Sequence, residues 1–248
     1  MLAFLLVGLA GFIAGAQNAI AGGGSFLTFP ALLYAGLDPR AANINSTIAL
    51  FPGQATTGWA GRSMAEGAAG LSLFTLFAVS VVGGGFGAVL LLATPVSVFT
   101  HLIPWLILFA TLVFIWGSFF AQKRGEDDPA PVSPRVAIFL QFLIGVYGGY
   151  FGGGIGILML AALTAAGLSV RHAGATKNVL AGVVNVAAVV IFVARSHINW
   201  ELVVDQGITA IAGGQVGVYM LRRVPEIVLR IVITGIGVAL TVAMFLRS

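Results

Sequence analysis

Residues 22–47 read GGGSFLTFPALLYAGLDPRAANINST, and residues 152–178 repeat the same plan as GGGIGILMLAALTAAGLSVRHAGATKN. Each copy opens with three glycines, runs through a short apolar segment, and ends in a polar group. The apolar segments, 25–36 and 155–167, would rise about 18–20 Å as helices, whereas the hydrocarbon core of a bilayer is about 30 Å thick. We therefore expect neither segment to cross a membrane alone, and we predict that each forms one arm of a re-entrant hairpin that is broken at the glycines.

The likeness between the two copies extends over both halves of the chain. An offset of 131 residues aligns Gly36 with Gly167, Leu37 with Leu168, Arg40 with Arg171, Ala42 with Ala173, Asn45 with Thr176 and Gln54 with Asn185. An offset of 130 aligns the triple glycines, Gly83-Gly84 with Gly213-Gly214, Gly87 with Gly217 and Pro95 with Pro225. We predict two membrane repeats, residues 1–121 and 135–248, joined by a cytoplasmic linker, QKRGEDDPAPVSP, at residues 122–134.

The composition indicates that the solvent of this chain is membrane lipid. Of its 248 residues, 59% are hydrophobic and only 8% are charged, and the mean hydropathy is +1.05. A soluble domain of ordinary composition is far less apolar. The short alternation of apolar and polar residues that is typical of a transmembrane β-barrel is absent from the sequence. We therefore predict an all-α, polytopic membrane protein.

Five apolar runs recur in each repeat, at about 2–20, 25–36, 42–61, 68–93 and 96–121, and again at about 135–151, 155–167, 173–194, 202–221 and 225–246. If the first two runs of a repeat form a re-entrant hairpin, the other three cross the bilayer, and the second repeat is inverted relative to the first. With the linker in the cytoplasm, most Lys and Arg residues fall on the cytoplasmic side and both termini lie outside, in keeping with the positive-inside rule. If the hairpins span the bilayer fully, the sides of the loops stay the same.

A lysine stands inside the polar group of the second copy. Apart from Lys123 in the linker, Lys177 is the only lysine of the chain, and every Asp and Glu falls in the linker or near an end of an apolar run. A charge within the membrane is costly and needs a partner. A bound anion would supply it, and the free N–H groups of helices that start at the glycine breaks would add to its binding. The alternative is that Lys177 extends to the cytoplasmic interface beside Arg171 and His172.

Other polar residues and glycines near the breaks complete the candidate site. Hydroxyl and amide groups donate hydrogen bonds to anionic oxygens, and glycine lets a backbone approach a ligand closely. Together with Lys177, the candidate substrate-binding residues are Asn45, Ser46, Thr176, Asn178, Gln54, Asn185, Gly23, Gly24, Gly153, Gly154, Gln17 and Asn18. The alternative is hydrogen bonding between helices for the polar residues and tight helix packing for the glycines.

Other classes of protein fit this sequence poorly. Ser25 follows the first glycine break, but the glycine and the histidine base expected around a serine nucleophile are absent, so an intramembrane hydrolase is a remote alternative. Neither glycine cluster continues into a phosphate-binding loop, and no spacing of His, Cys or acidic residues indicates a metal site. The net charge of +4 is scattered over loops, which argues against nucleic acid as a partner. We expect no enzyme activity and no cofactor.

The repeated motifs resemble the sulfite exporter TauE/SafE family of small membrane permeases, and the likeness covers nearly the whole chain. The residues that carry it are the triple glycines, Gly36 to Ala42, Asn45-Ser46-Thr47, Gly167 to Ala173 and Thr176-Lys177-Asn178. The resemblance implies a secondary transporter of sulfur-containing anions, such as sulfite, sulfoacetate or other organosulfonates, in a bacterial inner membrane. Alternating access of the two repeats would carry the anion. The alternatives are a passive anion channel and a transporter of another small organic anion.

Overall fold

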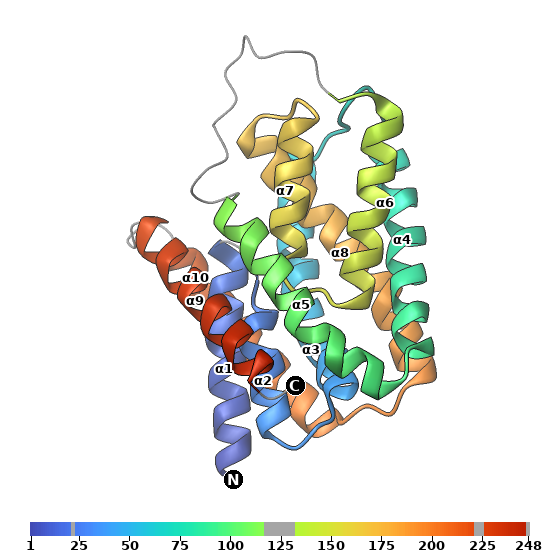
Figure 1. The fold of residues 1–248 in the computed structure, drawn as a ribbon. Helices are drawn as coiled ribbons and strands as arrows, with labels where there is room; N and C mark the ends of the chain where they lie inside the picture. Colours follow the sequence, from blue (N-terminus) through green and yellow to red (C-terminus); the bar gives the residue numbers. More distant parts are fainter. Residues whose placement is uncertain (21–22, 117–131, 221–225, 247–248) are drawn as a thin grey trace.

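The computed structural model describes residues 1–20, 23–116, 132–220 and 226–246 (Figure 1). These residues form ten α-helices and a short 3₁₀ helix, η1, and contain no β-strand. In chain order the helices are α1 Leu2–Ile20, α2 Ser25–Tyr34, α3 Pro39–Gly61, η1 Arg62–Met64, α4 Leu73–Ala93, α5 Val96–Ile115, α6 Pro134–Tyr150, α7 Ile155–Ala165, α8 Val170–Arg195, α9 Trp200–Met220 and α10 Glu226–Phe245. The all-α prediction is confirmed for the described residues, and residues 122–131 of the predicted linker lie outside them.

The glycine breaks separate long helices from short ones. α2 has 10 residues and α7 has 11, so neither is long enough to cross a bilayer. Gly23, Gly152 and Gly154 have φ angles of +86°, +78° and +79°, a left-handed backbone that favours glycine. Val132, before α6, and Ala166, after α7, line one small cavity, so α6 and α7 run antiparallel and return to the same end of the bundle (Figure 1).

At the end of the bundle opposite the linker, several residues fix where α3 begins. Asp38 accepts hydrogen bonds of 3.0 Å from the backbone N–H groups of Arg40 and Ala41, and Pro39 follows it at the start of the helix. The guanidinium of Arg40 donates to the carbonyl oxygens of Leu92 (3.3 Å) and Thr94 (3.1 Å) at the end of α4. A cation at a helix C-terminus is electrostatically favourable, so these bonds hold the start of α3 against α4.

The helices of each half pack mainly against helices of the other half. α1 packs along α9 and α6 along α4, while α3 and α8 pack on each other at the centre. α3 also packs on α9, and α8 on α4. Glycines allow the backbones to touch: a Cβ on Gly213 of α9 would overlap the carbonyl oxygen of Phe12, and one on Gly149 of α6 would overlap that of Gly84.

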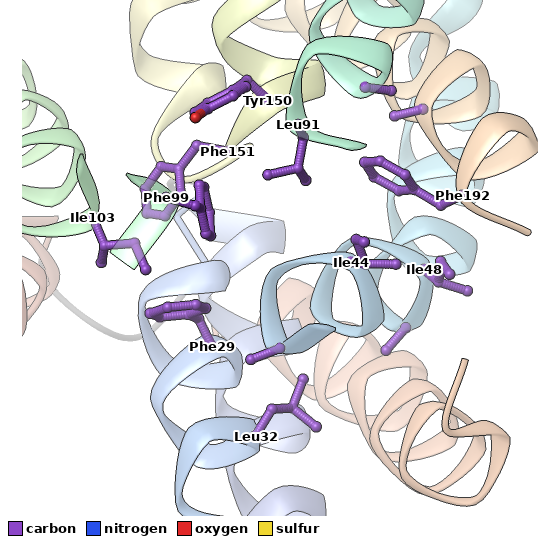
Figure 2. Close-up of a cluster of buried hydrophobic side chains, with 14 of the residues drawn as sticks. Phe29, Leu32, Ile44, Ile48, Leu91, Phe99, Ile103, Tyr150, Phe151 and Phe192 are labelled. Carbon is purple, nitrogen blue, oxygen red and sulfur yellow. The ribbon is translucent and has the colours of Figure 1, made fainter. Parts of the chain in front are cut away.

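The larger apolar core closes the end of the bundle opposite the linker. Figure 2 shows its side chains converging from α2, α3, α4, α5, α8 and the tip after α6. The ring of Phe151 at this tip packs edge-to-face on Phe29, and the ring of Tyr150 packs in the same way on Phe99. A second cluster, with Ile155 among its members, joins α4, α6, α7 and α8 toward the linker end.

The outer surface of the bundle suits a lipid environment. Three described helical segments are long and apolar enough to cross a membrane, namely Leu73–Ala93, Val96–Val113 and Arg171–Arg195. Large apolar side chains are exposed around the bundle, and Phe74 on α4 is 78% exposed. Exposed apolar surface on this scale is unfavourable in water and favourable in hydrocarbon. The helical bundle agrees with a polytopic membrane protein.

Candidate functional site

A pocket lies where the two glycine breaks meet at the centre of the bundle, and its lining comes from α1, α2, α3, α7, α8 and α9. The centre of a water molecule can reach a volume of about 90 Å³ inside it. One water needs roughly 10–15 Å³ of such space, so the pocket has room for a small ligand. Its polar lining side chains are Asn18, Ser25, Gln54, Thr56, Thr57, Lys177, Asn178 and Gln215.

Lys177 reaches this pocket from α8 and lies beside the start of α7. A Cβ on Gly156, in the first turn of α7, would lie 3.7 Å from Nζ of Lys177. The first turn of a helix carries a positive partial charge, so α7 and the ammonium present the same sign of charge to the pocket. Among the described residues, no group forms an ion pair or a hydrogen bond with this ammonium. The pocket therefore contains a positive charge that the described part of the chain does not neutralise.

The first glycine break brings a second helix start to the same pocket. Gly23 and Ser25, at the start of α2, both line it. Asn18 of α1 lines it too, and its Oδ1 accepts a hydrogen bond of 2.7 Å from the N–H of Gly24. Because this bond uses the amide oxygen of Asn18, the amide nitrogen remains as a donor. Two helix starts and an amide donor thus surround the space that Lys177 enters.

Gln54 and Asn185, which the sequence offset aligns, hydrogen-bond to each other between α3 and α8, with Nδ2 of Asn185 as the donor and Oε1 of Gln54 as the acceptor. Gln54 lines the pocket, whereas Asn185 is 3% exposed and does not. Since the amide oxygen of Gln54 already accepts this bond, its amide nitrogen is the group left to meet a ligand. Asn185 therefore acts on the pocket through Gln54.

Asn45 and Thr176, a second aligned pair, hold loops and do not line the pocket. Oδ1 of Asn45 accepts a hydrogen bond of 2.9 Å from the N–H of Asn199, just before α9. Oγ1 of Thr176 accepts one of 3.0 Å from the N–H of Glu66 and donates one of 3.1 Å to its carbonyl oxygen. Each residue ties its helix to a loop from the other half of the chain, which is the packing role considered for these polar residues.

Five further candidates from the sequence lie outside the pocket lining: Gln17, Gly24, Ser46, Gly153 and Gly154. The hydroxyl of Ser46 lies 2.6 Å from that of Thr28, a contact that joins α3 to α2. The carbonyl oxygen of Gly153 accepts a hydrogen bond of 2.8 Å from the hydroxyl of Tyr147 on α6. These contacts hold the glycine breaks and the helices beside them in place around the pocket.

Sequence reasoning missed part of the polar lining. Thr56 and Thr57 follow Gln54 on α3, and Gln215 lies on α9, yet none of the three was a candidate. Their polarity was a signal, but the sequence did not show which side of each helix faces the pocket. Thr56, Gln215 and the lining residue Ile211 are exposed and lie toward the linker ends of α3 and α9. Among the described residues, they form a rim that opens toward the linker end of the bundle.

Comparison with known proteins places the chain in a family. A family model described as sulfite exporter TauE/SafE matches residues 7–244. The probable membrane transporter protein ORF9 of Sinorhizobium sp is 34% identical over 221 residues, which cover 88% of this chain and 82% of that protein. A probable membrane transporter protein of Haemophilus influenzae is 27% identical over 241 residues, covering 94% and 91% of the two chains. The probable membrane transporter protein YfcA of Escherichia coli K12 is 29% identical over 203 residues, covering 79% and 71%. The chain therefore belongs to the sulfite exporter TauE/SafE family.

Proposed function

We propose that the protein is a secondary transporter that carries a small sulfur-containing anion, such as sulfite, sulfoacetate or another organosulfonate, across the bacterial inner membrane. The observation that carries this proposal is the ammonium of Lys177, which lies beside the start of α7 without a partner among the described residues. Both features favour a negative ligand and disfavour a cation. The description of the family supports a sulfur anion, and the names of the relatives support transport.

The donors around the pocket suit the oxygens of a sulfonate or sulfite group. Such a group has three oxygens that point in different directions, so its recognition requires donors from several sides. Lys177 and Asn178 lie on α8, Gln54 on α3 and Asn18 on α1, while the starts of α2 and α7 add backbone N–H groups. Hydrogen bonds to a charged ligand contribute about 1.5–3 kcal/mol each, so a few such donors are enough for specific binding.

The pairing of the helices supports two inverted repeats. If α1 to α5 correspond to α6 to α10, the packing of α1 on α9 corresponds to that of α6 on α4. The packing of α3 on α9 likewise corresponds to that of α8 on α4, and α3 and α8 are each other's counterparts. This exchange is what a twofold axis between the halves would produce. With the linker cytoplasmic, α1–α2 and α6–α7 would then be re-entrant hairpins whose tips meet at the binding site.

One pair of equivalent contacts differs between the halves, and the difference supports alternating access. A Cβ on Gly84 of α4 would lie 2.7 Å from the carbonyl oxygen of Val184 on α8, so these helices touch. The equivalent positions are Gly214 of α9 and Gly53 of α3, and a Cβ on Gly53 would have no atom within 4 Å. The pocket occupies the α3–α9 side, where the two helices touch at Ala49 and Gly207 but are apart at Gly53. We infer that α3–α9 closes and α4–α8 opens when the anion passes to the other side of the membrane.

Replacement of Lys177 by alanine tests the proposal. We expect the half-saturating concentration for counterflow of labelled sulfoacetate into proteoliposomes to rise about 10–100-fold, because an interaction with a charged group worth about 1.5–3 kcal/mol is lost. The matched control is Lys123→Ala, which removes the only other lysine, in the linker. The control should exchange sulfoacetate as the wild-type protein does.

The same measurement separates transport from its alternatives. Saturable counterflow supports a carrier, whereas flux that rises linearly with concentration and shows no counterflow would mean a passive anion channel. Sulfite and a panel of small carboxylates, tested as competitors, decide whether the site prefers sulfur oxyanions. Equal affinity of wild-type protein and Lys177→Ala for every anion would refute the role of Lys177.

A further inference from the structure

An acidic side chain with an unpaired oxygen lies inside α9. From the sequence alone, every Asp and Glu was expected near the end of an apolar run. In the structure α9 starts at Trp200, and Asp205 lies beyond its first turn, which Glu201 occupies. The Oδ2 atom of Asp205 is buried, and no described group forms a hydrogen bond with it. Asp205 is the only carboxylate among the described residues that lies inside a helix beyond its first turn.

The carboxyl group of Asp205 packs against the backbone of α1. A Cβ on Gly8 would lie 3.3 Å from Oδ2 and 3.4 Å from Oδ1. The next residue, Gln206, is 0% exposed, and neither Oε1 nor Nε2 of its side chain has a partner. Buried polar groups without partners are rare and cost about 1–3 kcal/mol each, so two neighbouring residues of this kind call for an explanation.

No cation among the described residues neutralises Asp205. The helices that pack along α9 are α1 and α3. The only ionisable group of α1 is the amino group of Met1 at its start, and the guanidinium of Arg40 on α3 is bound to the end of α4. Glu201, on α9 itself, has the same sign of charge as Asp205, and Asp38 lies at the start of α3. Arg62, at the linker end of α3, stacks on Trp59.

The interface that contains Asp205 leads to the pocket. Gly8, Gly11 and Gly15 lie along one face of α1, and each of them contacts α9. Gly15 and Ala210 belong to the pocket lining, so the carboxyl and the pocket share the same pair of helices. A change in the packing of α1 on α9 at Asp205 therefore reaches the pocket directly.

We propose that the carboxyl of Asp205 binds a proton that is carried together with the anion, so that the protein is a proton–anion symporter. This inference rests on the proposed function. With a proton on Asp205 and one negative charge of the anion at Lys177, the charges of the two sites balance, and in the empty protein Asp205 and Lys177 are opposite in sign, whereas either ligand alone leaves an unbalanced charge. The doubly loaded protein and the empty protein are then the two forms in which the binding site changes the side of the membrane to which it is open. The proton enters from the water on one side and is released to the water on the other, so no bond other than O–H forms or breaks.

A sodium ion fits these residues less well than a proton. Sodium requires several oxygen ligands, and the described residues contain no cluster of three or more His, Cys, Asp or Glu side chains. A proton requires only the one oxygen that is unpaired.

The Asp205→Asn variant separates coupling from exchange. In proteoliposomes with a pH gradient and the membrane potential held at zero, the wild-type protein should accumulate sulfoacetate about tenfold per pH unit if coupling is one to one. Asp205→Asn, which resembles the protonated acid, should lose this accumulation and retain counterflow within about threefold of the wild type, since loaded exchange requires no net proton movement. The matched control is Glu201→Gln, one turn earlier on α9, which should accumulate the anion like the wild type.

Three results would overturn the proton site. The first is that Asp205→Asn accumulates the anion as much as the wild type does. The second is that this variant loses counterflow. The third is that accumulation by the wild type follows a sodium gradient and not a pH gradient. If Asp205→Asn does not fold, a pH-sensitive dye inside wild-type vesicles gives the answer: addition of sulfoacetate should acidify the interior, and no pH change would refute symport. Absence of counterflow in the wild-type protein is a separate result, which would contradict the proposed function itself.

Discussion

Replacement of Gly213 by alanine is expected to force α1 away from α9 and to lower the apparent melting temperature of the purified protein by about 5–10 °C. Gly213 faces the backbone of α1, and a Cβ at this position would overlap the carbonyl oxygen of Phe12. The obstacle is backbone, so no rotamer change can relieve it. Because α1 and α9 share the lining of the pocket, transport should fall together with stability.

The matched control for this prediction is Gly174→Ala on α8. A Cβ on Gly174 would have no atom within 4 Å, and alanine favours a helix over glycine by up to about 1 kcal/mol. The control should therefore melt at the wild-type temperature or above. The apparent melting temperature of both variants is measured in detergent by heating samples and determining, by size-exclusion chromatography, how much folded protein remains. A Gly213→Ala protein as stable as Gly174→Ala would show that α1 and α9 are not in backbone contact.

The short helices α2 and α7 were predictable from the sequence because their signal, the length of the apolar run, is local. The runs after Gly24 and Gly154 are too short to cross a bilayer whatever they pack against. Three glycines in a row do not decide a break by themselves, because Gly83-Gly84-Gly85 lie inside the continuous helix α4. The repeat register identified equivalent positions but did not predict contacts between them. It aligned Gln54 with Asn185, and these side chains meet because α3 and α8 pack on each other.

The division of the polar residues between site and scaffold was not predictable in the same way. Thr176 stands beside Lys177, and Asn45 stands in the equivalent polar group of the first copy. One helix position turns a side chain by about 100°, enough to direct it to a loop and away from the pocket. In a helix that is apolar on most sides, periodicity does not show which face meets a neighbour. Thr56 of the pocket and Asp205 of α9 were therefore identified only when the packing of α3 and α9 was known.

Replacement of Gly53 by leucine is expected to hold the protein open toward the linker end and to reduce counterflow by about 100-fold or more. The first atom of the added side chain has room in the present structure, since a Cβ on Gly53 has no atom within 4 Å. It would occupy the space into which Gly214 must move if α3 and α9 close as α8 and α4 do at Val184 and Gly84. An obstacle of this size in a closing contact costs several kcal/mol, and each 1.4 kcal/mol is a tenfold change in the equilibrium.

Binding and exchange respond differently to this obstacle, which makes the prediction specific. Gly53 itself lines the pocket, so loss of heat stabilisation by sulfoacetate in Gly53→Leu would mean that the leucine blocks binding, whereas retained stabilisation with lost exchange would mean that it blocks closure. Ala60→Leu, at an exposed position near the end of the same helix, is the matched control and should exchange the anion normally. If Gly53→Leu exchanges sulfoacetate at the wild-type rate, α3 and α9 do not close at Gly53. The access of the pocket to the two sides of the membrane would then have to alternate through some other movement of the helices. The reason is that the contact between Gly84 and Val184 would have no counterpart in the second state.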